Sequence, residues 1–423
     1  MRWRHRLSTS TLSIDATTHT IGIPACTDGT PSAMPTTHLK KTHHIGHRPS
    51  FECIALLLQG GGALGAYQAG VYEALAEAGI HPDWVAGISI GAINAALIAG
   101  NSPEKRVEKL REFWEKITDE SLGGWLPDLL GPLGKGDWSR TLTSRMSAGM
   151  AMMHGVADFF TPRFPSPWLR EAGAIEATSF YDTVKLKSTL ETLVDFDRIN
   201  AEKTRFSVGA VNVRTGNFVY FDTTTHRIRP EHVMASGALP PGFPAVEIDG
   251  EAYWDGGLVS NTPLQWVMDS VPRQDTLAFQ VDLWNARGNF PADLAEVETR
   301  RKEITYSSRT RASTDQFKYA QRIRNTVASL LDSLPDNMKD NPDAKFLRSL
   351  ADEKAYNIVH LIYRARNYEG YSKDYEFSRV SMETHWRAGY NDTVRTLRHP
   401  HVLERPANHE GVAIFDLEHD GRE

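Results

Sequence analysis

The first regular pattern in the chain is a short apolar run that ends in glycines. It covers residues 51–58, and a run of this length bounded by glycine is typical of a buried parallel strand. From residue 66 to about residue 78, apolar side chains recur at the spacing of one helical face, and Gly79 is a typical terminator. A second strand pattern, residues 84–88, leads directly into a helix predicted over residues 91–99. This strand–helix–strand–helix order predicts a parallel sheet.

The next part of the chain changes from regular to irregular patterning. Ser102 and Pro103 are expected to cap an amphipathic helix that runs to about residue 117. Between residues 121 and 179 the periodicity is broken by Gly and Pro, while Trp, Met and Phe accumulate, Trp125 and Trp138 among them. Apolar but irregular sequence of this kind predicts a cap or lid region.

Regular patterns return in the second half of the chain. The turn Asp249-Gly250 is the strongest short hairpin signal in the sequence. The elements predicted there are a helix near residues 188–194, a hairpin of 206–213 with 218–221, a hairpin of 245–248 with 252–254, a strand over 276–283, a mostly helical region over 292–333, a strand over 357–363 and a helix over 381–397.

These patterns divide the chain into three parts. Residues 1–50 have no apolar period and hold six of the sixteen histidines, so we expect a disordered tail. Residues 51–290 are expected to form the main folded domain, with the cap at 121–179, and residues 291–423 a mostly helical C-terminal extension. The composition of the tail resembles that of an organellar transit peptide, and a translation start at Met34 is the alternative. Without neighbouring Cys or acidic residues, its histidine cluster (His38, His43, His44 and His47) is better explained by solvation than by metal binding.

Composition and charge exclude several classes of protein. Of the 423 residues, 40% are hydrophobic and 24% are charged, which is typical of a globular protein. The formal net charge of −6 argues against nucleic acid as a partner. The chain has two cysteines, Cys26 and Cys53, and no run of 18 apolar residues. We therefore expect a cytoplasmic protein that does not span a membrane, although contact with a membrane surface stays open.

A G-x-S-x-G pentapeptide is the first candidate for chemistry. Gly87, Ser89 and Gly91 lie between a predicted strand and a predicted helix, which is the context of a nucleophile elbow. The turn is too tight for a Cβ atom on either side of the serine, and the helix N-terminus favours developing negative charge. The alternative is a tight turn with an incidental serine.

The glycine-rich segment 60–65 joins the first strand to the first helix, and its backbone N–H groups can converge on an anion. It matches the dinucleotide fingerprint G-x-G-x-x-G, but that fingerprint requires an acid at the end of the second strand. The nearest candidate, Asp83, precedes that strand. The favoured hypothesis is an oxyanion hole, in which Gly61 and Gly62 donate to a tetrahedral intermediate formed by Ser89.

Four motifs in order resemble the patatin-like phospholipase family. They are Gly60-Gly-Gly-Ala-Leu-Gly65, Gly87-Ile-Ser-Ile-Gly91, Ala235-Ser-Gly-Ala-Leu-Pro-Pro-Gly-Phe-Pro244 and Asp255-Gly-Gly257. The resemblance implies a three-layer α/β/α sandwich with a mainly parallel sheet, and lipid ester hydrolysis without metal or cofactor. It implies a dyad of Ser89 as nucleophile and Asp255 as general base, with an oxyanion hole at Gly60, Gly61 and Gly62. The supporting motif positions are Gly65, Gly87, Gly91, Gly256 and Gly257.

Two departures from the family pattern stand near the glycine loop. Leu64 occupies a position where the family often has Arg or Lys, and Gln59 one where plant members carry Asp. A side-chain cation for an acidic headgroup is therefore not expected there. The segment that includes residues 373–378 and 381–390 resembles the C-terminal extension of one bacterial branch of the family.

The predicted function is hydrolysis of a lipid carboxylic ester, of phospholipase A or lysophospholipase type. One alternative is an α/β-hydrolase triad with His360 or His385 as the base. Others are hydrolysis of another insoluble ester, such as an intracellular polyester, and a lipid-surface binding protein without turnover. The expected partner is the lipid ester, while contact with a membrane or lipid particle and pairing with a second copy of the chain through the extension stay open. Residues 300–324 carry eight Lys or Arg and two acids, a basic segment that could face anionic lipid or solvent.

Overall fold

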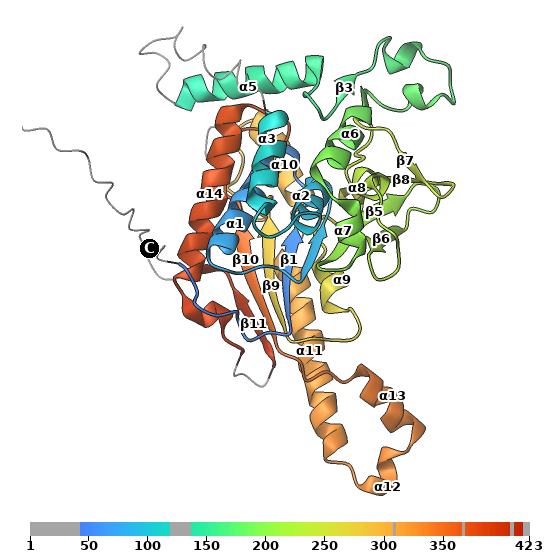
Figure 1. The fold of residues 1–423 in the computed structure, drawn as a ribbon, viewed down its shortest axis with the longest axis vertical. Coiled ribbons are helices and arrows are strands. Elements are labelled where there is room, and N and C mark those ends of the chain that lie inside the picture. Colours follow the sequence, from blue (N-terminus) through green and yellow to red (C-terminus); the bar gives the residue numbers. More distant parts are fainter. Residues whose placement is uncertain (1–42, 119–136, 308–309, 366–368, 407–409, 418–423) are drawn as a thin grey trace, which may run out of the picture. The chain divides into compact units, whose positions relative to one another are not determined.

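The computed structural model describes residues 43–118, 137–307, 310–365, 369–406 and 410–417, which belong to one compact unit (Figure 1). Within these ranges nine strands form one sheet. Eight of them lie in the order β11 (Val412–Phe415), β10 (Tyr356–Ile362), β9 (Thr276–Asp282), β1 (Cys53–Leu58), β2 (Trp84–Gly87), β5 (Arg205–Asn212), β8 (Glu251–Asp255) and β7 (Val246–Ile248). The ninth, β6 (Phe218–Asp222), pairs with β5.

The pairings from β11 to β5 are all parallel, whereas β5 pairs antiparallel with both β6 and β8, and β8 pairs antiparallel with β7. Strand β1 lies in the middle, where it pairs with β2 on one edge and with β9 on the other. All six of its residues are buried, as a central parallel strand covered on both faces requires. The two predicted hairpins are confirmed, and Asp249 and Gly250 both have positive φ in the second turn.

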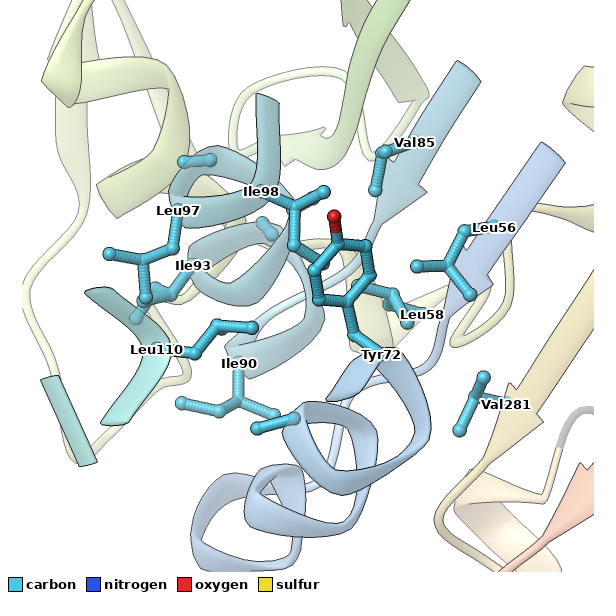
Figure 2. Close-up of a cluster of buried hydrophobic side chains, with 14 of the residues drawn as sticks. Leu56, Leu58, Tyr72, Val85, Ile90, Ile93, Leu97, Ile98, Leu110 and Val281 are labelled. Atoms are coloured by element: carbon cyan, nitrogen blue, oxygen red, sulfur yellow. The ribbon is translucent and has the colours of Figure 1, made fainter. Parts of the chain in front are cut away.

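Alternate side chains of β1 enter two different cores. Leu56 and Leu58 pack on one face with Val85 and Val281, and the helical residues Ile90, Ile93 and Leu97 cover them (Figure 2). Ala55 and Leu57 belong to the opposite core, which Leu264, Met268 and Phe317 cover. The sheet therefore has helices on both faces, and the predicted three-layer α/β/α sandwich is confirmed.

The first core is covered by α1 (Ala66–Glu77), α2 (Ile90–Ala99), α3 (Arg106–Lys116), α6 (Val184–Leu193), α8 (Pro230–Ser236) and α14 (Arg379–Leu397). The second core is covered by α9 (Leu264–Met268) and α11 (Thr310–Asp332). The remaining helices with a label in Figure 1 are α5 (Asp137–His154), α7 (Phe196–Asn200), α10 (Leu294–Tyr306), α12 (Asp336–Lys339) and α13 (Pro342–Leu350). Helix α3 begins later than predicted: its N-cap is Lys105, whereas the sequence indicated Ser102. No helix within the described ranges is both long enough and apolar enough to cross a bilayer.

The C-terminal extension, residues 291–423, is built into the same sandwich. Strand β10 pairs with β9 along its full length, and β11 continues the same sheet. Helix α14 lies along α1 (Figure 1), and the two backbones nearly touch at a pair of glycines. A Cβ atom on Gly70 would lie 1.9 Å from the Trp386 carbonyl oxygen, and one on Gly389 would lie 2.0 Å from that of Tyr67.

The end of the predicted tail is also ordered, which corrects the boundary at residue 50. Residues 43–50 pack against the end of α1 and the start of β2, where they form hydrogen bonds and ion pairs. His43 is buried, with Nε2 3.4 Å from a carboxylate oxygen of Glu77. The Ile45 N–H donates to the Ala78 carbonyl, and Arg48 pairs with Asp83. The rest of the tail, including His38 and Met34, lies outside the described residues.

The predicted cap contains a long helix where an irregular segment was expected. Helix α5 spans 18 residues of this region. It is followed by the short ribbon of β3 (Thr161–Pro162) with β4 (Tyr181–Asp182) and by two 3-10 turns. Trp125 and the side chain of Trp138 lie outside the part of the chain that the structure describes.

Candidate active site

Ser89 stands in a strained turn between β2 and α2. Its φ of 56° is uncommon for a residue with a Cβ atom, and α2 begins at the next residue. The turn requires glycine on both sides: a Cβ on Gly87 would lie 2.2 Å from the Gly91 carbonyl oxygen, and one on Gly91 would lie 2.3 Å from that of Leu58. The Ser89 N–H donates to Ser236 Oγ at 3.0 Å, which fixes the turn from outside. A strand, a tight turn and a helix thus follow one another at Ser89.

The strand register brings Asp255 to the same place. Ala210 and Val211 of β5 pair with both β6 and β8, so these two strands must occupy opposite edges of β5. Strand β8 therefore shares its edge with β2, just beyond the point where β2 ends at Gly87. Asp255 is the last residue of β8, and Ser89 follows β2 by two residues. Both side chains consequently converge at the carboxyl end of β2, although 166 residues separate them in the sequence.

The Asp255 carboxylate is almost fully buried and accepts two hydrogen bonds. The Gly257 N–H donates to Oδ1 at 2.7 Å, and the Ser89 side chain donates to the same carboxylate. Burial raises the pKa of Asp255 to about 7, and the two hydrogen bonds oppose that rise. A carboxylate with such a pKa can exchange a proton with Ser89 near neutral pH.

The glycine loop lies against this pair, but its three candidate donors are not equivalent. The Gly60 N–H already donates to the Asn261 carbonyl at 3.3 Å. Within the described residues, the N–H groups of Gly61 and Gly62 donate to no backbone or side-chain acceptor. The next N–H, that of Ala63, donates to the Asp374 carbonyl at 2.8 Å. Only the middle two donors of the loop are therefore available to a ligand.

Ser89, Asp255 and the glycine loop line one cavity of about 370 Å³. Its walls are mainly apolar and come from the cap, α2, the 237–243 segment and the C-terminal extension. Asp255 and Asp374 are the charged side chains among the described lining residues, and no histidine, lysine or arginine occurs there. The apolar lining residues include Ile93, Ala151, Met152, Phe159, Phe160, Leu186, Met234, Leu239, Phe243 and Phe377.

The two histidines considered as triad bases lie elsewhere. His360 is on β10, with Nδ1 3.8 Å from a carboxylate oxygen of Asp282. His385 is on α14, with Nε2 3.6 Å from Glu369. Neither side chain lines the cavity.

Two residues that support the site, Asn261 and Gln59, were given no role from the sequence. The Asn261 side chain donates to the carbonyl oxygens of Gly60 at 3.1 Å and Tyr306 at 2.8 Å, joining the glycine loop to α10. Its position shortly after the Asp255-Gly-Gly motif was the one available signal. Gln59 accepts from the backbone N–H groups of Leu283 and Trp284, at 2.6 and 2.9 Å, so its role is structural.

Most of the basic side chains that the structure describes in segment 300–324 are paired with acids. Arg300 pairs with Glu303, Lys302 with Asp374, and Arg324 with Asp269. Lys318 and Arg322 both face Glu410. These pairs remove much of the charge excess that favoured contact with anionic lipid.

No group of three or more His, Cys, Asp or Glu side chains in the described part of the chain is arranged to hold a metal ion. Cys53 is a buried free thiol on β1, away from the cavity lining.

Comparison with known proteins identifies two matching family profiles. Residues 56–267, half of the chain, match the patatin-like phospholipase profile, and residues 304–409 match a second profile described as patatin phospholipase.

Patatin-like phospholipase domain-containing protein 6 of Homo sapiens is 44% identical over 210 residues, which are 50% of this chain and 12% of that protein. Lysophospholipase nte1 of Aspergillus terreus is 49% identical over 57 residues, 14% of this chain and 4% of that protein. The chain thus spans a small part of the length of these relatives. Among solved structures, VipD from Legionella pneumophila aligns with a TM-score of 0.38 and 16% identity, over 87% of this chain and 72% of that one.

The profile match covers the glycine loop, the elbow at Ser89 and the strand that ends at Asp255, in the same order as the sequence motifs. The chain belongs to the patatin-like phospholipase family.

Proposed function

We propose that this chain hydrolyses a carboxylic ester of a lipid, with Ser89 as nucleophile and Asp255 as general base. The observation that carries the proposal is the hydrogen bond from Ser89 to a buried carboxylate inside an apolar cavity. The two available N–H groups of Gly61 and Gly62 line the same cavity. A nucleophile, a base and a pair of oxyanion donors in one concave site are the parts that acyl transfer requires.

In the first half-reaction, Ser89 Oγ attacks the ester carbonyl carbon while its proton passes to Asp255. The negative charge that develops on the carbonyl oxygen is held by the N–H groups of Gly61 and Gly62, and the nearby N-terminus of α2 adds a favourable dipole. Collapse of the tetrahedral intermediate breaks the bond to the alcohol, which leaves with the proton from Asp255. The product is an acyl-enzyme on Ser89.

In the second half-reaction, a water molecule takes the place of the alcohol. Asp255, again ionised, accepts a proton from this water as its oxygen attacks the acyl carbon. The same glycine N–H groups stabilise the second tetrahedral intermediate, and Ser89 leaves with the proton from Asp255. The carboxylic acid is released and the enzyme is restored.

The lining of the cavity favours a lipid as the acyl donor. Aromatic and aliphatic side chains dominate the walls, so an alkyl chain gains free energy by leaving water, by roughly 0.8 kcal/mol per methylene group. The names of the relatives, a lysophospholipase and a patatin-like phospholipase, agree with such a substrate. An insoluble polyester would also present apolar ester chains, so it belongs in the substrate screen.

We also propose that the cap meets the lipid surface. Met152 lines the cavity and is 55% exposed, so the apolar lining continues onto the outside of the molecule. Large apolar side chains of the same region are strongly exposed, including Phe164, Trp168, Leu169 and Ile175. The chain that carries them runs between Phe160 and Tyr181, which both line the cavity, and exposed apolar groups are typical of an interaction surface.

The test is a hydrolysis screen with phospholipid, lysophospholipid, neutral lipid and polyester substrates, comparing the wild type with Ser89→Ala. The variant should lose all hydrolysis and covalent labelling by a fluorophosphonate, yet keep its melting temperature, because one hydroxyl is removed from a turn whose glycines remain. A labelled wild type with no hydrolysis in any arm would leave a lipid-binding protein as the better interpretation. Hydrolysis by Ser89→Ala would refute the mechanism.

A further inference from the structure

Asp374 of the C-terminal extension touches the glycine loop directly. Its backbone carbonyl accepts the Ala63 N–H at 2.8 Å. A Cβ atom on Gly62 would lie 2.1 Å from the same oxygen, so only glycine permits this approach. Gly62 also has a φ of 56°, in the left-handed region. The geometry of the loop is therefore set partly by a residue 312 positions later in the chain.

Lys302 of α10 holds Asp374 in this place. Its Nζ lies 2.7 and 2.8 Å from the two carboxylate oxygens of Asp374 and donates to the Tyr371 carbonyl at 3.3 Å. The same ammonium group lies 4.1 Å from the centre of the Tyr371 ring and 5.0 Å from that of Tyr375. The pair is mostly shielded from water, with side-chain exposures of 16% and 20%. A cation with so many fixed partners is more strongly held than an ordinary surface ion pair.

A second ion pair joins the same two segments, with the positive charge now on the extension and the negative charge on α10. Lys373 Nζ lies 2.7 Å from a carboxylate oxygen of Glu303, and its side chain is 4% exposed. Glu303 also accepts from Arg300 at 3.1 Å. Two consecutive residues of α10 thus pair with two consecutive residues of the 371–375 segment, which fixes that segment in both position and register.

We infer that the Lys302–Asp374 ion pair positions the glycine loop for oxyanion binding, so that the C-terminal extension completes the active site. This inference rests on the proposed function. The Ala63 N–H is engaged by the Asp374 carbonyl, which leaves the preceding two N–H groups as the donors to the substrate. Lys302 and Asp374 act as positioning residues: they hold the loop and take no part in bond making.

Loss of the ion pair should lower turnover but should not prevent the substrate from binding. Removal of a complete oxyanion donor typically costs about 10²–10³ in kcat, so misplacement of the loop should cost about tenfold or more. Binding of a short ester depends on the apolar walls, which stay in place, so KM should change much less than kcat. Lys302→Arg keeps the charge and should retain more turnover than Lys302→Met.

The experiment compares Lys302→Met, Asp374→Asn and Lys302→Arg with the full-length wild type on a nitrophenyl ester. Active sites are counted by fluorophosphonate labelling, so that kcat is expressed per competent site and loss of folded protein is separated from loss of positioning. Asp374→Asn keeps the backbone carbonyl and the side-chain shape, and it serves if Lys302→Met does not fold. Lys354→Met, which breaks a 2.8 Å pair with Glu52 far from the cavity lining, is the matched control.

The expected result is a tenfold or larger loss of kcat per site in Lys302→Met and Asp374→Asn, and none in Lys354→Met. The double variant should lose no more than either single variant, because both remove one interaction. Wild-type kcat per site in the two single variants would overturn the inference, and so would an equal loss in the control. A wild type that neither hydrolyses esters nor labels at Ser89 would instead refute the proposed function itself.

Discussion

Replacement of Asp255 by Asn should stabilise the folded protein while it stops turnover. The wild-type carboxylate is buried, and its pKa rises from 3.8 to about 7 because burial disfavours the charged form. In the unfolded chain the same group ionises near its ordinary value. The folded state therefore binds the proton more tightly, and the stability that protonated Asp255 contributes is lost as the pH rises towards 7.

The size of this effect follows from the two pKa values. At pH 5 the folded wild type keeps Asp255 mostly protonated, and at pH 8 it must ionise the group inside the cavity. Between pH 5 and the folded pKa of about 7, each pH unit lowers the free energy of unfolding of the wild type by about 1.4 kcal/mol. The stability advantage of Asp255→Asn over the wild type should thus grow by about 3 kcal/mol between pH 5 and pH 8. An asparagine at this position can still accept the Gly257 N–H and meet Ser89 through its amide.

The assay is urea unfolding at both pH values, followed by tryptophan fluorescence. Asp249→Asn, which removes an exposed carboxylate from the turn of the same hairpin, is the matched control and should show no comparable trend. The wild-type kcat/KM should rise with pH around 7, because Asp255 must be ionised to accept the proton from Ser89. A stability difference that does not change with pH, or a flat activity profile from pH 5 to 8, would refute the buried-base argument.

Two further predictions address the base and the lipid surface. His360→Ala and His385→Ala should keep most of the turnover per labelled site, since neither side chain lines the cavity; a loss of about 10³ or more in kcat would favour a histidine triad. Trp168→Ser with Leu169→Ser should weaken vesicle binding and hydrolysis of aggregated lipid but spare a short soluble ester, because both side chains are more than three-quarters exposed. Equal loss on both substrates, with a lower melting temperature, would show that this face supports the core.

The part of the site that depends on local sequence was predictable. Ser89 and its flanking glycines lie within five residues, and the tight turn follows from the residue types alone. Strands β1, β2 and β9 carry short apolar runs that are buried on both faces, and these were predicted within a residue or two. Asp255 was assigned to the same site from the order of the four motifs, and the structure brings its side chain and Ser89 to one cavity.

Features that depend on distant contacts were not predictable. The Gly60 N–H donates to the Asn261 carbonyl, and the Ala63 N–H donates to the Asp374 carbonyl. Residues hundreds of positions away therefore decide which N–H groups of the loop are available to a ligand. Helix α5 was missed because the prediction covered 121–179 as a whole, and the Gly and Pro residues that break the periodicity of this region lie mostly on either side of the helix. Strand β11 has four residues at the sheet edge, too few for a periodic signal.

The contact between Asp374 and the glycine loop has a consequence for the nascent chain. Ser89 is synthesised 285 residues before Asp374. Strand β10, which pairs with β9 in the sheet, is also synthesised well after Ser89. At about 5–20 residues per second, synthesis of that interval takes roughly 15–60 s. If the loop needs Asp374 to reach its working geometry, the nucleophile is inert throughout this time. The proposed ester hydrolysis is then silent until Asp374 has been synthesised.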